Sequence, residues 1–195
     1  MEDMTTRYYS ENAPVFFADT VAVAMDPLYA RFLPHIPPGG HILDAGCGSG
    51  RDTLAFLERG YQVTAFDASP SLASLAERHT GQPVRVLRLQ DMEWSQTFDG
   101  IWACASLLHV PAAELPEVMG RLAGALRPGG VLYASFKYGH GERERQGRRF
   151  TDLDVAGLRA PLAQVPGLTE PETWISQDLR PGRAAERWLN TLLAA

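Results

Sequence analysis

LDAGCGSGRD, residues 43–52, is the stretch of sequence that decides the fold. An apolar run ends at Asp44 and is followed by three glycines within five positions, Gly46, Gly48 and Gly50. A strand that leads into a glycine-rich turn and then a helix is typical of ligand sites in open α/β sheets. Missing side chains let a ligand approach the backbone, and the free N–H groups of a helix start favour a negative group.

The spacing of the glycines argues against two common nucleotide motifs. The dinucleotide fingerprint G-x-G-x-x-G needs a glycine where Arg51 stands, and the phosphate loop that ends in Gly-Lys-Ser or Gly-Lys-Thr is absent. Asp67 lies 21 residues after Gly46, a distance at which a carboxylate takes both hydroxyls of a ribose. Asp44 would repel phosphate and attract a cation. S-adenosylmethionine, a nucleoside with a sulfonium and an amino acid end, fits these features.

Strand-like and helix-like segments alternate along the chain, which favours an α/β fold with a mainly parallel sheet. Ser69 is placed to cap a helix with Pro70 at its first position, and Thr151 or Asp152 is placed to cap another. The expected strands are 41–46, 61–67, 83–91, 98–108 and 131–137, with a further candidate at 168–178. The expected helices are 11–33 with breaks at prolines, 49–60, 69–79, 111–126 and 151–165.

The C-terminal third is less regular. Residues 138–149 predict a polar, glycine-punctuated loop. The tail 184–195 is ambiguous, because its apolar residues fit a helical stripe better than strict alternation. These residues are Trp188, Leu189, Leu192 and Leu193.

Size and composition indicate one globular domain. The chain has 195 residues, of which 45% are hydrophobic and 21% charged. The net charge of −5 argues weakly against a nucleic-acid binder. Cys47 and Cys104 do not have the spacing of metal ligands, and no signal peptide or membrane span is evident. We therefore expect a soluble, cytoplasmic protein without a metal, in which both cysteines are core residues rather than nucleophiles.

Five stretches together resemble the successive motifs of class I S-adenosylmethionine-dependent methyltransferases. They are ILDAGCGSGRD, VTAFDAS, LQDMEW, FDGIWACASLLHV and LRPGGVLYASFK, in order over about residues 40–137. Within that family, GCGSGRD and the FKYGHGE…GRRFTD segment are similar to small stand-alone tellurite-resistance methyltransferases. The resemblance implies a Rossmann-like three-layer sandwich with a mostly parallel seven-stranded sheet, an antiparallel last strand and an N-terminal helical lid.

The resemblance also implies a division of the single domain. Residues 1–38 would form a helical cap, 39–137 the cofactor-binding core, and 138–195 a substrate loop followed by the last sheet strands.

The same resemblance assigns cofactor contacts residue by residue. Asp44 would face the methionine amino group, next to the loop of Gly46, Gly48 and Gly50. Asp67 would bind the ribose hydroxyls, with Ala68 alongside. The remaining contacts would be Asp91 with the adenine amine, Met92 with the adenine ring, and Ala105 with the methionine part.

Other interpretations of these residues stay open. Arg51 would pair with the methionine carboxylate, or with Asp52 or Glu58 on its own helix. Asp67 alone could simply end a strand and cap the next helix, and Asp91 could be a turn residue. The tryptophans Trp94 and Trp102 are better explained as core residues than as cofactor contacts.

Candidate catalytic residues lie after the fourth and fifth strands. Methyl transfer is an in-line displacement that depends mainly on alignment and exclusion of water, with a base to help some acceptors. His109 could be such a base, or could only pack against or cap the next helix. Lys137, Tyr138 and His140 would stand over the methyl group if the loop folds inward.

Candidate acceptor contacts lie in two places. The 138–149 loop carries four arginines, among which Arg148 and Arg149 could bind an anionic acceptor through forked contacts, although such a charge run is usually a solvated surface. Tyr8, Tyr9 and Phe17 resemble the lid that covers the cofactor in related enzymes, or they pack their helix onto the core.

We therefore expect methyl transfer to a small molecule by a monomer or homodimer, releasing S-adenosylhomocysteine. Little sequence lies outside the core to recognise DNA or protein, and the N-P-P-Y type signature is absent. The alternatives are an RNA or protein methyltransferase, or a protein that binds S-adenosylmethionine without catalysis.

Overall fold

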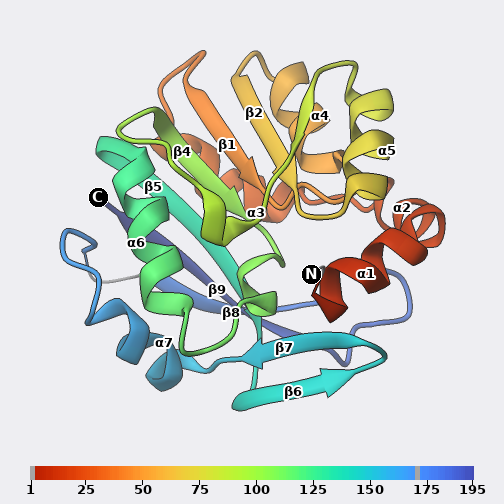
Figure 1. Cartoon of the computed structure of the whole chain (residues 1–195). Coiled ribbons are helices and arrows are strands. Elements are labelled where there is room, and N and C mark those ends of the chain that lie inside the picture. Colours follow the sequence, from red (N-terminus) through yellow and green to blue (C-terminus); the bar gives the residue numbers. More distant parts are fainter. Residues whose placement is uncertain (1–2, 170–171) are drawn as a thin grey trace.

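The computed structural model describes residues 3–169 and 172–195. Its centre is a seven-stranded sheet with the strand order β3-β2-β1-β4-β5-β9-β8 (Figure 1). The strands are β1 (His41–Ala45), β2 (Gln62–Asp67), β3 (Val84–Val86), β4 (Phe98–Ala103), β5 (Leu126–Lys137), β8 (Glu172–Gln177) and β9 (Arg187–Ala194). The first five are parallel to one another, whereas β9 runs antiparallel to β5 and β8. The expected Rossmann-like sheet with an antiparallel last strand is confirmed.

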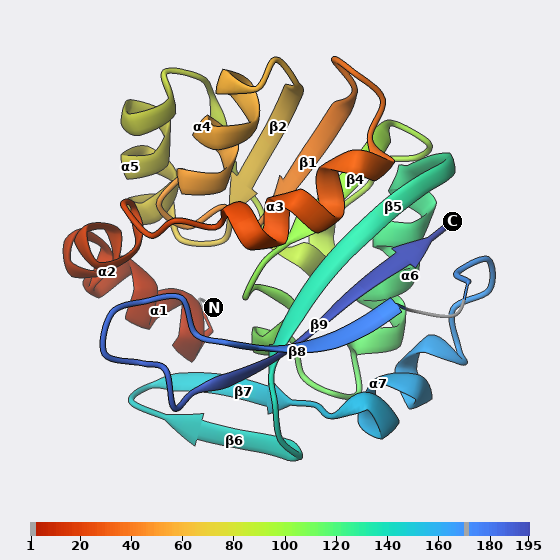
Figure 2. The same ribbon diagram turned by 180° about the vertical axis from the view of Figure 1, so that it is seen from behind.

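Helices cover both faces of the sheet (Figures 1 and 2). The helices α6 (Leu115–Ala125) and α7 (Val155–Leu162) lie on one face. The other face carries α3 (Asp26–Phe32), α4 (Arg51–Glu58) and α5 (Pro70–Thr80). Short 3-10 turns occupy Leu33–His35, Leu89–Asp91 and Leu107–His109.

The strand order reverses between β1 and β4. After β1 the chain adds β2 and β3 on one side, and it then returns to place β4 and β5 on the other side. In the register, Asp44 lies opposite Ala65 of β2 and Trp102 of β4. Ligands bind at the carboxyl ends of strands next to such a reversal. The glycine loop follows β1 at this point.

Two further units lie at the carboxyl edge of the sheet. One is formed by α1 (Met4–Glu11) and α2 (Ala13–Thr20), and the other is a hairpin of β6 (Gly141–Arg145) and β7 (Arg148–Asp152). Both views show α1 between the strand ends and this hairpin (Figures 1 and 2). The N-terminal helices thus lie over the end of the sheet where the glycine loop sits.

The capping prediction at α5 is correct. The Ser69 hydroxyl accepts a hydrogen bond from the Leu72 N–H at 3.2 Å, and Pro70 occupies the first helical position. At α7 the prediction is wrong by two or three residues. The cap is Asp154, which accepts from Gly157 N–H at 2.7 Å, because Thr151 and Asp152 are still in β7.

One expectation for the C-terminal third is wrong, and the open question of its tail is answered. Residues 141–152 are a hairpin rather than a loop, and its outer strand β6 is exposed along its whole length, so it has no apolar alternation to reveal it. The tail is β9, not a helix. Leu189 and Leu193 pack in the part of the core that α6 covers, whereas Leu192 packs in the part that α3 covers. Because both faces of β9 are therefore buried, its sequence does not alternate between apolar and polar residues. The strand expected at 168–178 is β8, with part of its expected range outside the described residues.

The carboxylate of Asp52 joins three elements in the core. It is buried and accepts hydrogen bonds from Tyr29 of α3 at 2.5 Å and from the indole N–H of Trp102 of β4 at 2.8 Å. Arg51 adds a two-pronged ion pair at 2.7 and 2.8 Å. Although burial acts to raise the pKa of Asp52, Arg51 and these hydrogen bonds keep that pKa below its usual range. Trp102 is fully buried, so its core assignment is confirmed.

Replacing Asp52 by alanine should strongly destabilise the protein. The substitution leaves the Arg51 guanidinium unpaired and two buried donors without an acceptor. We expect the free energy of unfolding to fall by about 3–5 kcal/mol. The matched control is Glu58→Ala at the exposed end of the same helix, which should change it by less than about 0.5 kcal/mol. Urea unfolding followed by circular dichroism measures both, and equal losses would contradict the assigned role.

Candidate active site

The glycine loop is held tightly between two strand ends. The N–H groups of Gly46 and Cys47 both donate to the carbonyl of Phe66, at 3.0 and 2.9 Å. At Gly46 the backbone has φ 83°, and a Cβ there would lie 2.6 Å from the Cβ of Ser106. Only glycine is compatible with that approach. The loop therefore lies directly against the end of β4.

Asp67, at the end of β2, ties the same loop to α5. One of its oxygens accepts from Gly48 N–H at 2.9 Å, and the other accepts from Ser69 N–H at 2.8 Å. Its side chain lines the main cavity, and burial raises its pKa. Each carboxylate oxygen has a further lone pair, so the group can still accept two hydrogen bonds from a ligand.

Asp44 lies beneath the loop rather than in the cavity wall. Its carboxylate is buried and accepts a hydrogen bond from the Thr53 hydroxyl at 2.6 Å. Burial, with the nearby Asp52 carboxylate, raises the pKa of Asp44 to about 8. A cation that came within reach of the loop would favour the charged form of this group.

The end of β4 is strained and faces the loop. Ala105 has φ 54°, a conformation that residues with a Cβ rarely adopt, and its N–H donates to the Ser135 hydroxyl at 2.8 Å. The next hydroxyl, on Ser106, is buried and has no hydrogen-bond partner among the described residues. Both residues line the cavity. Strain and an unpartnered polar group at one place are typical of a functional site.

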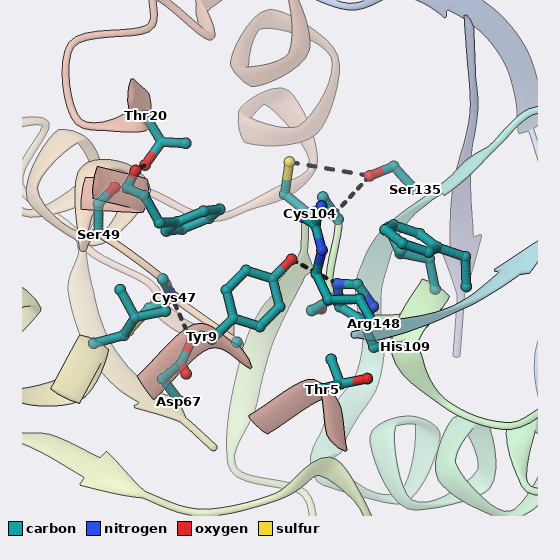
Figure 3. A pocket seen from close by; sticks show the side chains of 18 of the residues that line it. Thr5, Tyr9, Thr20, Cys47, Ser49, Asp67, Cys104, His109, Ser135 and Arg148 are labelled. Carbon is teal, nitrogen blue, oxygen red and sulfur yellow. Dashed lines mark hydrogen bonds between the residues drawn. The ribbon is translucent and has the colours of Figure 1, made fainter. Parts of the chain in front are cut away.

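Helix α1 closes the cavity from above. The Tyr9 hydroxyl and the Nε2 of His109 are 2.9 Å apart (Figure 3). The backbone N–H of Arg149 in β7 donates to the Thr5 hydroxyl at 3.0 Å. Figure 3 shows the Tyr9 ring between Asp67 on one side and His109 on the other. The helix is thus attached to both the 3-10 turn after β4 and the hairpin.

The hydrogen bonds of His109 define its tautomer. Its Nδ1 is 2.7 Å from the carbonyl oxygen of Arg149, which can only accept, so Nδ1 carries the proton. Nε2 then accepts the hydrogen bond from Tyr9. Burial lowers the pKa of His109 to about 4. His109 is therefore a neutral hydrogen-bond acceptor around pH 7.

An ion-pair network borders the far side of the cavity. Asp178 accepts two hydrogen bonds from Arg180, one of them at 2.9 Å, and one from the indole N–H of Trp188 at 3.1 Å. Lys137 pairs with Asp178 at 3.3 Å and also with Glu186. Burial acts to raise the pKa of Asp178, but the Arg180 hydrogen bonds hold it well below its usual range. This network joins β5 to the β8–β9 connection.

These elements enclose a cavity of about 540 Å³, a size that suits a small ligand. Many of the residues predicted for the site line it, namely Gly46, Gly48, Arg51, Asp67, Ala68, Ala105, His109, Lys137, Tyr8, Tyr9 and Arg148. Arg51 forms an ion pair with Asp52, which is one of its predicted partners.

Eight predicted site residues do not line the cavity: Asp44, Gly50, Asp91, Met92, Tyr138, His140, Phe17 and Arg149. Gly50 is the N-cap of α4. Met92 is buried in the core behind α6. Phe17 packs edge-on against His79, with ring centroids 5.6 Å apart. These three are explained by packing and local structure.

Four other residues outside the cavity wall have partners at the surface: Asp91, Tyr138, His140 and Arg149. Asp91 makes a two-pronged pair with Arg88, at 2.7 and 2.8 Å, and the preceding residues 87–90 line the cavity instead. The side chain of His140 is 81% exposed, and Tyr138 is also exposed. The side chain of Arg149 reaches Glu142 at 3.4 Å. These four residues therefore lie outside the cavity in this structure, and their roles at a ligand stay predictions.

Sequence reasoning missed several cavity residues. Ser106 and Ser135 lie in predicted strands and in the quoted motif stretches, but the sequence analysis assigned no role to these small polar residues. Other missed residues come from the β8–β9 region, namely Asp178, Arg180, Trp188 and Asn190. Only their tertiary contacts bring them to the site, and no spacing in the sequence signals them.

Residues 3–169 and 172–195 contain no group of three His, Cys, Asp or Glu side chains arranged to hold a metal ion. No helix in this part of the chain has the length and apolar character needed to cross a membrane.

Comparison with known proteins identifies the domain. Residues 42–130 match the model of a methyltransferase domain family. The ubiquinone biosynthesis O-methyltransferase of Xanthomonas campestris pv. campestris (strain B100) is 34% identical over 105 residues, which are 50% of this chain and 43% of that protein. The chain thus spans less than half the length of this relative.

Solved structures extend the likeness of the fold to the whole chain. The 1,6-didemethyltoxoflavin-N1-methyltransferase of Burkholderia thailandensis, solved with S-adenosylhomocysteine, superposes with a TM-score of 0.73 at 24% identity, over 96% of this chain and 84% of that one. The cyclase SpnF superposes with a TM-score of 0.70 at 16% identity, over 97% and 94%. At these identities the likeness establishes the fold alone.

Residues 42–130 thus match a methyltransferase domain, and the sheet has the topology expected for class I S-adenosylmethionine-dependent methyltransferases. The predicted resemblance is supported by this match, and the solved Burkholderia thailandensis structure holds S-adenosylhomocysteine, the product form of the predicted cofactor. The narrower likeness to tellurite-resistance methyltransferases finds no support in these relatives.

The neutral state of His109 predicts a specific pH dependence. Its folded pKa of about 4 lies below the ordinary value of 6.5, so protonation opposes folding. The stabilising contribution is complete above pH 6.5 and is lost as the pH falls towards 4, by up to about 3 kcal/mol. NMR titration should show one histidine with a midpoint near 4, absent in His109→Gln. A midpoint near 6.5 would contradict the buried hydrogen-bonded state.

Proposed function

We propose that this protein transfers a methyl group from S-adenosylmethionine to a small-molecule acceptor and releases S-adenosylhomocysteine. The observation that supports this most is the position of Asp67 and the Gly46–Gly48 turn, which face one enclosed cavity at the strand reversal. Such a site suits a nucleoside, and the match of residues 42–130 supports the cofactor.

The residues present fit this cofactor. The glycine loop leaves space that side chains would fill, and Asp67 keeps free lone pairs for two ribose hydroxyls. We place the methionine part beside Ala105 and the unpartnered Ser106 hydroxyl, with Arg51 near its carboxylate. Residues 87–90, rather than Asp91 and Met92, would contact the adenine. Asp44 would act from below the loop as a counter-charge.

When bound, S-adenosylmethionine supplies an already activated methyl group as a sulfonium. The chain's own contribution is then alignment of the acceptor and exclusion of water. Helix α1, the hairpin and the β8–β9 connection would cover the site. His109, through the Tyr9 hydroxyl, is placed to accept a proton from the acceptor. Lys137 is engaged with Asp178 and Glu186 and would position groups rather than take a proton.

The small-molecule acceptor is supported by the enclosure of the cavity beneath α1. We further propose that the acceptor is anionic, that the protein acts in the cytoplasm as a monomer or homodimer, and that the three-part division at residues 38 and 137 describes its functional regions. An RNA or protein acceptor is the enzymatic alternative. A non-catalytic S-adenosylmethionine-binding protein is the other, because a fold does not by itself establish methyl transfer, and the cyclase SpnF has the same fold.

Release of S-adenosylhomocysteine tests the proposal. The protein would be incubated with S-adenosylmethionine and either a metabolite panel or total tRNA, and the product measured by mass spectrometry. Turnover with metabolites alone supports a small-molecule acceptor, and turnover with tRNA alone overturns it. Cofactor binding by calorimetry without release under any condition would favour a binding protein.

Asp67→Ala should weaken cofactor binding. Removing two charge-assisted hydrogen bonds, each worth about 1.5–3 kcal/mol, should raise the Kd for S-adenosylhomocysteine by at least about tenfold. Asp91→Ala is the comparison, since that carboxylate faces Arg88 outside the cavity and should matter less than about threefold. Calorimetry measures the Kd for S-adenosylhomocysteine in both variants. A larger loss of affinity in Asp91→Ala than in Asp67→Ala would contradict the placement of the ribose at Asp67 and favour a cofactor contact at Asp91.

A further inference from the structure

Basic side chains outnumber acidic ones in the wall of the cavity. Eight arginine and lysine side chains line it, namely Arg51, Arg88, Lys137, Arg143, Arg145, Arg148, Arg180 and Arg183. Six of them pair with a carboxylate of the protein. Arg145 is exposed on the outer strand of the hairpin. Arg148 is the remaining one, and it is half-buried.

Arg148 is held by aromatic rings rather than by a counter-charge. Its guanidinium carbon lies 4.3 Å from the ring centre of Tyr8 and 5.3 Å from that of Phe150. One terminal nitrogen donates to the amide oxygen of Gln146 at 3.1 Å, and no carboxylate of the described residues lies within ion-pair distance. The Nε is buried and has no hydrogen-bond partner in the part of the chain that the structure describes. A buried donor in that state is unfavourable, and an anion would satisfy it by reorienting the guanidinium.

The charge of Arg148 also acts on the pair at the centre of the site. Burial is the main reason that the pKa of His109 is low and that of Tyr9 high, and Arg148 lowers both. An anion next to Arg148 would screen this charge and make His109 a better proton acceptor. Binding of an anionic acceptor would then make His109 a stronger base, which would help to remove a proton from that acceptor.

We propose that Arg148 is the anion-binding residue of the acceptor subsite, and that the acceptor carries a carboxylate or phosphate group. The role as acceptor subsite rests on the proposed function. Anion binding itself does not, because it can be measured without turnover. We assign Arg51 to the carboxylate of the cofactor, because it stands at the start of α4, directly after the glycine loop. Arg148 belongs instead to the hairpin beside α1 and lines another part of the cavity.

The experiment compares three probes of similar shape. Benzoate, phenyl phosphate and the neutral benzamide would be titrated by calorimetry into the protein saturated with S-adenosylhomocysteine. We expect benzoate or phenyl phosphate to bind at least about tenfold more tightly than benzamide, as one charge-assisted hydrogen bond provides. The better of the two anions identifies the acceptor class. Equal binding of benzamide, or no millimolar binding of either anion, overturns the proposal.

Variants separate Arg148 from general surface charge. Arg148→Gln should abolish the preference for the anion, and Arg148→Lys should keep part of it. Arg187→Gln is the matched control, because Arg187 also stacks on a tyrosine, Tyr138 at 4.7 Å, but lies outside this cavity. An equal loss in the control overturns the assignment. Arg148→Met, which keeps the stacked stem, replaces the glutamine variant if the latter unfolds.

Two further readouts give distinct outcomes. Affinity for S-adenosylhomocysteine should stay within about threefold in Arg148→Gln, and a loss as large as that for the anion would place Arg148 on the cofactor instead. The NMR midpoint of His109 should rise when benzoate is bound, and an unchanged midpoint contradicts the coupling. If S-adenosylhomocysteine does not bind the unmodified protein at all, the proposed function fails, whereas anion binding in its absence would still support Arg148.

Discussion

The buried carboxylate of Asp52 is the interaction on which the site depends. It fixes the first turn of α4, where the glycine loop ends, and orients Tyr29 and Trp102 from two other elements. The constraint continues across the sheet, because Trp102 stacks on Tyr133 at 4.0 Å and the Tyr133 hydroxyl donates to Asn190 of β9. In the buried Arg51–Asp52 ion pair, both carboxylate oxygens of Asp52 accept hydrogen bonds. A buried charged group that is fully hydrogen-bonded in this way favours one unique packing of the elements around it.

The two sides of the cavity differ in how firmly they are held. The floor consists of strand ends joined by ladder hydrogen bonds and core packing. The roof, α1, is attached through hydrogen bonds at Thr5, Tyr9 and Ser10, each with a net value of about 1 kcal/mol, and through aromatic contacts of Tyr8 and Tyr9. We therefore expect the roof to open at a lower free energy than the floor. A ligand can enter without unfolding the residues that recognise it.

The sequence predicts the floor well because local chemistry determines it. Asp44, Asp67 and the glycines sit where parallel strands end, and the sheet brings equivalent ends together. The roof is harder to predict. The sequence of β9 does not alternate between apolar and polar residues, because both faces of this strand are buried. The sequence of β6 does not alternate either, because this strand is exposed along its length. Asp91 lies outside the cavity because β3 ends at Val86 and a 3-10 turn follows, so the carboxylate turns towards Arg88. Asp178 and Arg180 reach the site only through tertiary folding.

The backbone at Ala105 is strained. A left-handed backbone at a residue with a Cβ costs about 1–3 kcal/mol, and the unpartnered Ser106 hydroxyl and Arg148 Nε border the same cavity. Variants selected only for heat resistance would tend to remove these features, for example by placing glycine at 105, and would lose ligand recognition as they gained melting temperature. Thermal stabilisation of the unmodified protein is consequently a practical screen for its ligands, since a molecule that satisfies those groups raises the melting temperature by mass action.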